Sequence, residues 1–220
     1  MYRVKEAFYT LQGEGAHSGR AAVFCRFSKC NLWNGREQDR LRSVCQFCDT
    51  DFVGTDGQNG GEFNSAEDLA SHLNGLWRGG PGGKPYVVCT GGEPLLQLDH
   101  ELIEALHLSG FEVGVETNGT LPAPAGIDWL CVSPKADAKV VISECDELKL
   151  VYPQELAPPT AFDHIVARHY WLSPMASPVK PANGQPDLQG MENTRAAIQY
   201  CMTHPRWRLT VQMHKMVGID

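Results

Sequence analysis

Three cysteines in the first quarter of the chain have the residue type and the spacing of an iron–sulfur site. Fourteen residues separate Cys30 from Cys45, and two residues separate Cys45 from Cys48. Cysteine thiolates hold such clusters, and three of them can bind three irons of a four-iron cluster while the fourth iron stays open to a reactant. The pattern therefore predicts a [4Fe-4S] cluster that is held by Cys30, Cys45 and Cys48 and takes part in chemistry.

A structural zinc site is the alternative interpretation of these residues. Cys45 and Cys48 have the Cys-x-x-Cys spacing of half such a site, and Cys25 and Cys30 could supply the other half. Cys25, however, lies in the apolar segment 22–27, where a small buried residue suffices. Four further cysteines are expected to be ordinary core or partly exposed thiols: Cys89, Cys131, Cys145 and Cys201.

A glycine-rich turn is a second candidate for ligand binding. The sequence Thr-Gly-Gly-Glu-Pro at 90–94 directly follows the apolar segment 86–89, which predicts a strand. Its two glycines let backbone groups approach a ligand that a side chain would hold away. Polar segments also follow two later predicted strands, with Glu-Thr-Asn-Gly at 116–119 and Ser-Pro-Lys at 133–135.

Alternating strands and helices must position these groups, and that alternation is typical of a parallel sheet. The polar segments would then gather beyond the carboxyl ends of the strands, as in an α/β barrel, but a full barrel usually needs about 250 residues. We therefore expect an α/β fold, an incomplete (open) parallel β/α barrel, in a single domain spanning 1–220. Strands are predicted at 22–27, 86–89, 112–115, 129–132, 147–151, 170–172 and 207–213, and helices at 65–77, about 98–106 and about 191–201.

The composition narrows the classes of function. The formal net charge is −7, and the Lys and Arg residues are scattered, which disfavours a nucleic-acid-binding protein. No apolar stretch is long enough to span a bilayer, and the N-terminus lacks the apolar segment of a secretory signal. We expect a cytoplasmic protein that binds neither nucleic acid nor membrane. In that reducing compartment its eight cysteines would be thiols or metal ligands rather than disulfides.

Taken together, these motifs resemble the radical S-adenosylmethionine superfamily. Most of its members place three residues between the first two cysteines, whereas a fourteen-residue gap preceded by Leu-Gln-Gly-Glu-Gly, here at 11–15, is similar to the 7-carboxy-7-deazaguanine synthase family. The resemblance extends through the motifs at 90–94, 116–119 and 133–135, and covers most of the chain. It implies an open barrel of the radical S-adenosylmethionine type and a homodimer.

For the cofactor, the resemblance implies that S-adenosylmethionine binds the open iron. A flavodoxin-like or ferredoxin-like protein would supply the electron that cleaves it to a 5′-deoxyadenosyl radical. The family usually has Gln-Pro-Met where this chain has Ser-Pro-Met at 173–175, so we expect contacts to adenine there to use the backbone or water. The residues implied to contact the cofactor are Phe47, Gly91, Gly92, Glu93, Glu116, Asn118, Ser133, Pro134, Lys135, Ser173, Pro174 and Met175.

For the substrate, the resemblance implies 6-carboxy-5,6,7,8-tetrahydropterin, which has a carboxylate at one end and a guanidine-like edge at the other. Arg26 could bind the carboxylate bidentately, unless it forms a surface ion pair. Thr50 would bind Mg²⁺ beside that carboxylate, although Asp-Thr-Asp at 49–51 alone favours a turn or helix cap. The implied substrate residues are Leu11, Gln12, Gly13, Glu14, Arg26, Thr90, His214 and Asp220.

The reaction implied by the resemblance is a ring contraction. Hydrogen abstraction at C6 of the pterin would lead to loss of ammonia and formation of 7-carboxy-7-deazaguanine, a step toward queuosine, with S-adenosylmethionine regenerated. Two alternatives stay open: a radical S-adenosylmethionine activase that acts on a protein partner, and a non-catalytic zinc-binding module. The segment 179–190, rich in Pro, Asn and Gly, is interpreted either as a mobile cover or as an insertion without a role.

Overall fold

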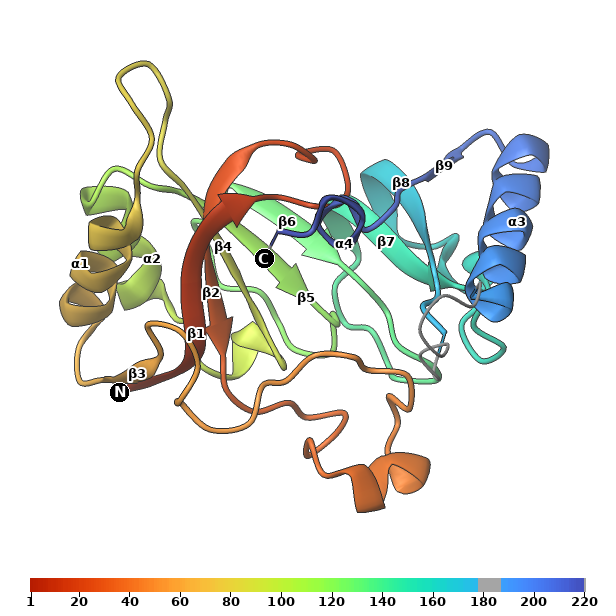
Figure 1. The fold of residues 1–220 in the computed structure, drawn as a ribbon, viewed down its shortest axis with the longest axis horizontal. Coiled ribbons are helices and arrows are strands. Elements are labelled where there is room, and N and C mark those ends of the chain that lie inside the picture. The colour runs from red at the N-terminus through yellow and green to blue at the C-terminus, as the bar shows by residue number, and fades with distance from the viewer. Residues whose placement is uncertain (178–186, 220) are drawn as a thin grey trace.

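A single sheet of nine strands is the frame of the computed structural model, which describes residues 1–177 and 187–219 (Figure 1). The strand order is β3-β1-β2-β4-β5-β6-β7-β8-β9. All neighbours from β2 to β9 are parallel, whereas β1 pairs antiparallel with β2 and β3. The strands are β1 (Tyr2–Leu11), β2 (Ala21–Phe27), β3 (Gly61–Phe63), β4 (Tyr86–Gly91), β5 (Glu112–Thr117), β6 (Trp129–Val132), β7 (Glu144–Tyr152), β8 (Val166–Pro174) and β9 (Trp207–Leu209).

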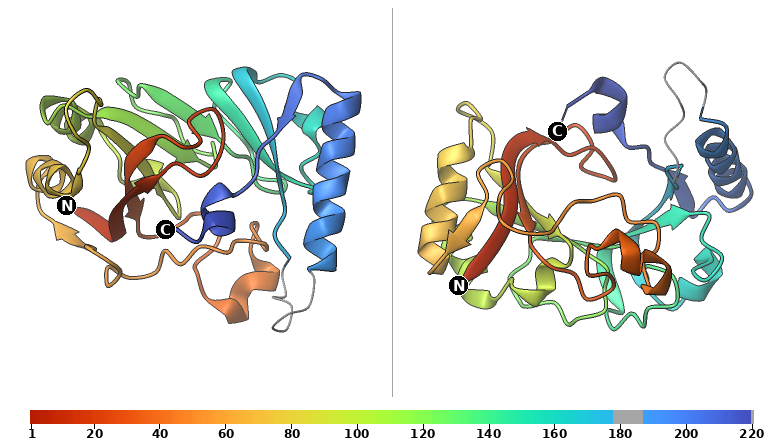
Figure 2. Two further views of the ribbon diagram at one scale, coloured as in Figure 1. Left: turned by 45° about the horizontal axis from the view of Figure 1, so that its top comes forward. Right: turned by 60° about the horizontal axis from the view of Figure 1, so that its bottom comes forward.

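Helices α1, α2 and α3 lie on the outer face of the curved sheet, with α1 and α2 together at one end and α3 at the other (Figure 2). Ser65 and Asp99 begin α1 and α2, since their side chains accept hydrogen bonds from backbone amides three residues on. The α-helices are α1 (Ala66–Leu76), α2 (His100–Leu108), α3 (Leu188–Thr203) and α4 (Met213–Val217); the short 3₁₀ helices are η1 (Glu37–Arg42), η2 (Pro94–Leu96) and η3 (Pro159–Phe162).

Two hydrophobic clusters hold the helices against the sheet. The first joins α1 and α2 to β1, β2, β4 and β5, with Leu69, Leu102 and Val87 fully buried. The second joins α3 to β7, β8 and β9 around Leu148 and Leu172. Side chains alternate across each strand, so the residues between these positions face the inside of the barrel and remain free to form a site.

The sheet ends at β3 and β9 rather than closing, which confirms the prediction of an incomplete parallel barrel. The β1–β2 loop lies inside this opening and bonds to the far end of the sheet: Gly15 N donates to Thr210 Oγ1 (2.9 Å) and Met213 N donates to Gly13 O (3.1 Å). The loop thus spans part of the gap that missing strands would fill.

Three segments differ from the sequence-based expectation. The predicted strand 207–213 is wrong beyond Leu209, because the chain there turns to bond with the β1–β2 loop and continues into α4. The long strand β1 was not predicted. Most of the segment 179–190 lies outside the described residues, and its last three residues begin α3. No helix in 1–177 or 187–219 has the length and apolarity needed to cross a membrane.

Candidate active site

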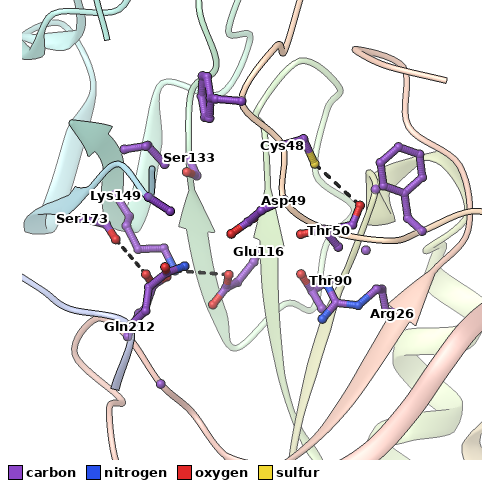
Figure 3. Close-up of a pocket in the computed structure, with 18 of the residues that line it drawn as sticks. Arg26, Cys48, Asp49, Thr50, Thr90, Glu116, Ser133, Lys149, Ser173 and Gln212 are labelled. Carbon is purple, nitrogen blue, oxygen red and sulfur yellow. Dashed lines mark hydrogen bonds and ion pairs between the residues drawn. The ribbon is translucent and has the colours of Figure 1, made fainter. Parts of the chain in front are cut away.

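A cavity of about 830 Å³ lies over the carboxyl ends of the parallel strands. This size suits a small organic ligand with its cofactor, and the location is where barrel enzymes bind their substrates. In Figure 3, Arg26, Thr50 and Thr90 lie on one side, Lys149, Ser173 and Gln212 on the opposite side, and Glu116 between them.

Most residues predicted for the site line this one cavity, although they come from the whole length of the chain. Glu93 and Pro134 do not line it, and Asp220 lies outside the described residues. The predicted residues that line the cavity are Leu11, Gln12, Gly13, Glu14, Arg26, Cys30, Cys45, Phe47, Cys48, Thr50, Thr90, Gly91, Gly92, Glu116, Asn118, Ser133, Lys135, Ser173, Pro174, Met175 and His214.

The three cysteines of the opening motif approach the cavity from the β2–β3 connection. A hydrogen bond between the thiols of Cys45 and Cys48 raises the pKa of Cys45 and lowers that of Cys48, and burial raises the pKa of Cys30. Cys25 lies on the opposite face of β2, in the hydrophobic core beside Val23 and Phe27, and cannot join them. Within 1–177 and 187–219, no group of three or more His, Cys, Asp or Glu side chains is already arranged as a metal site.

Arg40 holds the cysteine loop in place. Its guanidinium lies over the ring of Trp33 at 4.1 Å and donates to the carbonyl oxygens of Gln46 (3.0 Å) and Cys48 (2.9 Å). Trp33 in turn packs edge-to-face on Phe52, with 5.6 Å between ring centroids. These contacts fix the Cys-x-x-Cys segment against the side of the cavity, and neither Arg40 nor Trp33 was predicted as a site residue.

The two glycines at the end of β4, Gly91 and Gly92, are needed for close packing. A Cβ on Gly91 would lie 2.4 Å from Phe27 O, and one on Gly92 would lie 2.1 Å from Lys29 O and 2.9 Å from Cys30 Cβ. Gly91 also has φ 150°, in the region that favours glycine. The turn therefore needs glycine to sit directly against the backbone that leads to Cys30.

Glu93 connects the ends of two strands instead of facing the cavity. The carboxylate is fully buried and accepts hydrogen bonds from Thr117 Oγ1 (2.7 Å), Asn118 N (2.8 Å) and Leu95 N (3.0 Å). Burial raises its pKa. Through these bonds Glu93 fixes the start of the polar segment after β5, and any effect it has on a cofactor would pass through Asn118.

The next polar segments form their own hydrogen-bond networks at the edge of the cavity. Asn118 Nδ2 donates to Asn31 Oδ1 (2.9 Å), linking this segment to the cysteine loop. Lys135 Nζ donates to Ser133 O (2.9 Å), and Pro134 O accepts from Gln154 Nε2 (3.4 Å). Both segments are thus held in fixed positions before any ligand binds.

An ionic network spans the side of the cavity formed by the β1–β2 loop. Lys149 Nζ lies 2.8 Å from Glu14 Oε2 and 3.2 Å from Glu116 Oε2. Ser173 Oγ donates to Glu14 Oε1 (2.8 Å), and Gln12 Nε2 donates to Glu116 Oε1 (2.9 Å). Burial opposes ionisation of Glu14, but Lys149 and Ser173 outweigh it and lower its pKa to about 2.

Lys149 was missed by sequence reasoning. It lies within β7, where Leu148 and Leu150 point into the core and Lys149 points the other way. Alternation alone would have assigned such a residue to solvent, yet its side chain is only 6% exposed. The signal that could have found it is the polarity of Glu147 and Lys149 on a strand whose inner face should line a barrel.

Arg26 and Thr90 are cross-strand neighbours on the opposite side. Arg26 Nε donates to Glu6 Oε1 (2.7 Å), so it has the ion pair that the sequence left as an alternative, but it still borders the cavity. Thr50 lies beside them (Figure 3), and its carbonyl oxygen accepts from Cys48 Sγ (3.9 Å). This side therefore carries a guanidinium and two hydroxyl groups.

The C-terminal helix α4 borders the remaining side. The His214 ring lies so close to Gly13 that a Cβ there would come within 2.1 Å of Nδ1. Burial lowers the pKa of His214. Lys215 Nζ pairs with Asp49 Oδ2 at 2.6 Å, joining the helix to the segment after Cys48. Gln212, Asp49 and Lys215 line the cavity and were not predicted as site residues.

These features define the class to which the chain belongs: an open parallel β/α barrel in which three cysteines and several charged side chains border one cavity at the carboxyl ends of the strands. Its sequence is 58% identical to the 7-carboxy-7-deazaguanine synthase of Caulobacter vibrioides and 56% identical to that of Bordetella pertussis, with 99% of both chains covered in each comparison. The crystal structure of QueE from Escherichia coli superposes with a TM-score of 0.64 at 25% identity and covers 97% of this chain and 94% of its own. No family model matches the sequence. The chain belongs to the 7-carboxy-7-deazaguanine synthase family.

Proposed function

We propose that this enzyme converts 6-carboxy-5,6,7,8-tetrahydropterin to 7-carboxy-7-deazaguanine with loss of ammonia. The observation that carries the proposal is the meeting of three cysteines with polar side chains of β2, β4, β5, β7 and β8 around one cavity. Curated relatives with this name are 50–58% identical over nearly the full chain, which supports the same substrate. The cavity offers the guanidinium of Arg26 on one side and the carboxylates of Glu14 and Glu116 facing it, which suits a substrate with different chemistry at its two ends.

The donor set fits a [4Fe-4S] cluster better than a zinc ion. Cys30, Cys45 and Cys48 border one cavity, whereas Cys25 is buried on the other face of β2. Three thiolates would leave one iron open to S-adenosylmethionine. The cluster and S-adenosylmethionine together would supply a carbon radical that abstracts hydrogen, through one-electron cleavage of S-adenosylmethionine. Phe47, placed between two of the cysteines and lining the cavity, would contact the adenine.

The remaining residues would bind and orient the reactants. Arg26 would bind the substrate carboxylate, with Thr50 as the protein ligand of a Mg²⁺ ion beside it. Gly91, Gly92, Ser133 and Lys135 would hold the cofactor, and we include Asn118, Ser173, Pro174 and Met175 in this group. Holding both reactants near their reacting geometry is the main contribution that the chain itself can make.

We further propose a single domain and a homodimer in the cytoplasm, with a flavodoxin-like or ferredoxin-like protein as the reductant. One sheet running through the described residues supports the first point. The other points rest on similarity to the family.

The experiment is anaerobic incubation of the reconstituted, reduced protein with S-adenosylmethionine, Mg²⁺ and the carboxytetrahydropterin, followed by mass spectrometry. We expect 7-carboxy-7-deazaguanine. Cys48→Ala should abolish both product and cofactor cleavage, while Arg26→Ala should mainly raise KM for the pterin. Cofactor cleavage without the deazaguanine acid would reject this substrate and leave the radical class standing.

A further inference from the structure

Lys149 is the cation nearest two carboxylates on the anionic side of the cavity. Its side chain is 6% exposed, and those of Glu14 and Glu116 are 14% and 24% exposed. A lysine so deeply buried is costly unless it is paired, and here it contacts one oxygen of each carboxylate. The three side chains come from β7, β5 and the β1–β2 loop, so the lysine joins elements far apart in the sequence.

The carboxylates of Glu14 and Glu116 can still accept hydrogen bonds from a ligand in the cavity. The second oxygen of Glu14 accepts from Ser173, and that of Glu116 accepts from Gln12. A carboxylate oxygen can accept more than one hydrogen bond, so each retains capacity for a ligand N–H. Two carboxylates and one ammonium carry a net charge of −1, which favours a ligand edge made of donors.

We propose that Lys149 is a positioning residue that holds Glu14 and Glu116 as an ionised pair, and that this pair recognises the N–H donors of the substrate's aminopyrimidinone edge. The inference rests on the proposed function for the identity of the ligand. It assigns Glu116 to the substrate side, because its partners are Gln12 and Lys149. Arg26, on the opposite side of the cavity, would then meet the carboxylate end (Figure 3).

Removing the positive charge of Lys149 should change both the affinity for the substrate and the dependence of that affinity on pH. In Lys149→Met two buried carboxylates face each other without a counter-charge, and one of them should take up a proton near neutral pH. Other titratable groups face the site: Glu147 on β7, Cys131 on β6, Tyr86 on β4 and His214 on α4. A control must keep these groups unchanged.

Arg20→Met is that control. Arg20 lies at the end of the same loop and pairs with Glu112 on the same strand as Glu116, at 2.8 Å, but does not line the cavity. The variant therefore also loses an ion pair between these two elements, together with the stacking of Arg20 on Tyr86 at 3.9 Å, and it leaves the side chains of Glu14 and Glu116 and the contacts of Lys149 unchanged.

The test is equilibrium binding of 7-carboxy-7-deazaguanine to the oxidised holoenzyme from pH 6 to 8.5, by anaerobic calorimetry. The analogue that lacks the 2-amino group is the second probe, and S-adenosylhomocysteine is the third. Wild type and Arg20→Met should bind 7-carboxy-7-deazaguanine at least tenfold more tightly than the analogue that lacks the 2-amino group. This ratio should change little between pH 6 and 8.5. Lys149→Met should bind 7-carboxy-7-deazaguanine roughly tenfold to a hundredfold more weakly, gain affinity as pH rises, and lose the preference, whereas Lys149→Arg should restore part of it.

Three outcomes would overturn the inference: unchanged affinity and selectivity in Lys149→Met, equal preference for both compounds in wild type, or a loss confined to S-adenosylhomocysteine. Failure of wild type to bind the deazaguanine acid at all would instead count against the proposed function. If Lys149→Met does not fold, carboxyl ¹³C shifts of the wild-type holoenzyme test the same arrangement. The Glu14 carboxyl should stay ionised at pH 6, and a Glu14 carboxyl that titrates above this pH would contradict the proposal.

Discussion

Glycine at position 92, directly after β4, could be required for ligand access or for close packing against the backbone before Cys30. The Gly92→Ala variant distinguishes these two reasons. If the glycine served only ligand access, the ligand-free protein would tolerate alanine. In this structure the added Cβ would lie 2.1 Å from Lys29 O and 2.9 Å from Cys30 Cβ, and ordinary contact begins at 3.4 Å. The backbone before Cys30 would have to move by roughly 1 Å, a displacement of the size that can cost about a hundredfold in catalysis.

Overpacking of this kind costs about 1–3 kcal/mol. For a chain of this length we expect the melting temperature of the cluster-free variant to fall by roughly 2–12 °C. The variant should also retain less iron after reconstitution, because Cys30 is displaced. Differential scanning calorimetry of the cluster-free protein and iron analysis of the reconstituted protein are the two assays.

Gly75→Ala is the matched control. Gly75 lies in α1, and a Cβ there would meet nothing within 4 Å. Alanine is favoured over glycine inside a helix by up to about 1 kcal/mol, so this variant should be slightly more stable than wild type. If Gly92→Ala melts like wild type and holds as much iron, the packing argument for the glycine turn is refuted.

Three further predictions concern the residues around the cavity. Arg40→Met removes the hydrogen bonds to the loop carbonyls, including Cys48 O, so the reconstituted protein should retain less iron under dialysis. The free energy of unfolding measured in urea should fall by about 1–2 kcal/mol. Iron retention equal to wild type would contradict the role of Arg40 in holding the cysteine loop. The pKa of Glu14 is about 2 against an ordinary 4.5, so between these values the unfolded chain binds more protons, and the free energy of unfolding falls as pH drops through that range. Glu14→Gln should remove up to about 3 kcal/mol of this loss. If the free energy of unfolding of Glu14→Gln falls with pH as steeply as that of wild type, the pair between Glu14 and Lys149 is contradicted. Glu93→Ala leaves three buried donors, including Thr117 Oγ1, without their acceptor and should cost about 3–6 kcal/mol, which a melting temperature near that of wild type would contradict.

The sequence predicts those site residues that lie at or just after the carboxyl ends of strands. Arg26, Thr90, Glu116 and Ser133 lie at or just after the ends of parallel strands, and a parallel sheet brings these ends to one edge. Their convergence on one cavity therefore follows from the alternation of strands and helices. The motif at 11–15 meets them because its hairpin loop folds into the barrel opening.

Features that depend on contacts between distant segments were not predictable in this way. Glu93 stands beside the predicted ligand shelf, but its partners Thr117 and Asn118 are 24 and 25 residues further along the chain and draw it into the interior. Lys149 has an ordinary position in a strand, and its burial is explained only by its partners Glu14 and Glu116, which are 135 and 33 residues away in the sequence. Likewise, the turn into α4 depends on the bond between Met213 N and Gly13 O.

The proposed reaction requires Cys30, Cys45 and Cys48 to hold a four-iron cluster with one iron free for S-adenosylmethionine. Mössbauer spectra of ⁵⁷Fe-reconstituted protein, recorded with and without S-adenosylmethionine, test it most directly. We predict a [4Fe-4S] spectrum in which one of the four irons shifts on addition of the cofactor. A spectrum that the cofactor leaves unchanged, or a protein that binds zinc in place of iron, would contradict the proposed cluster.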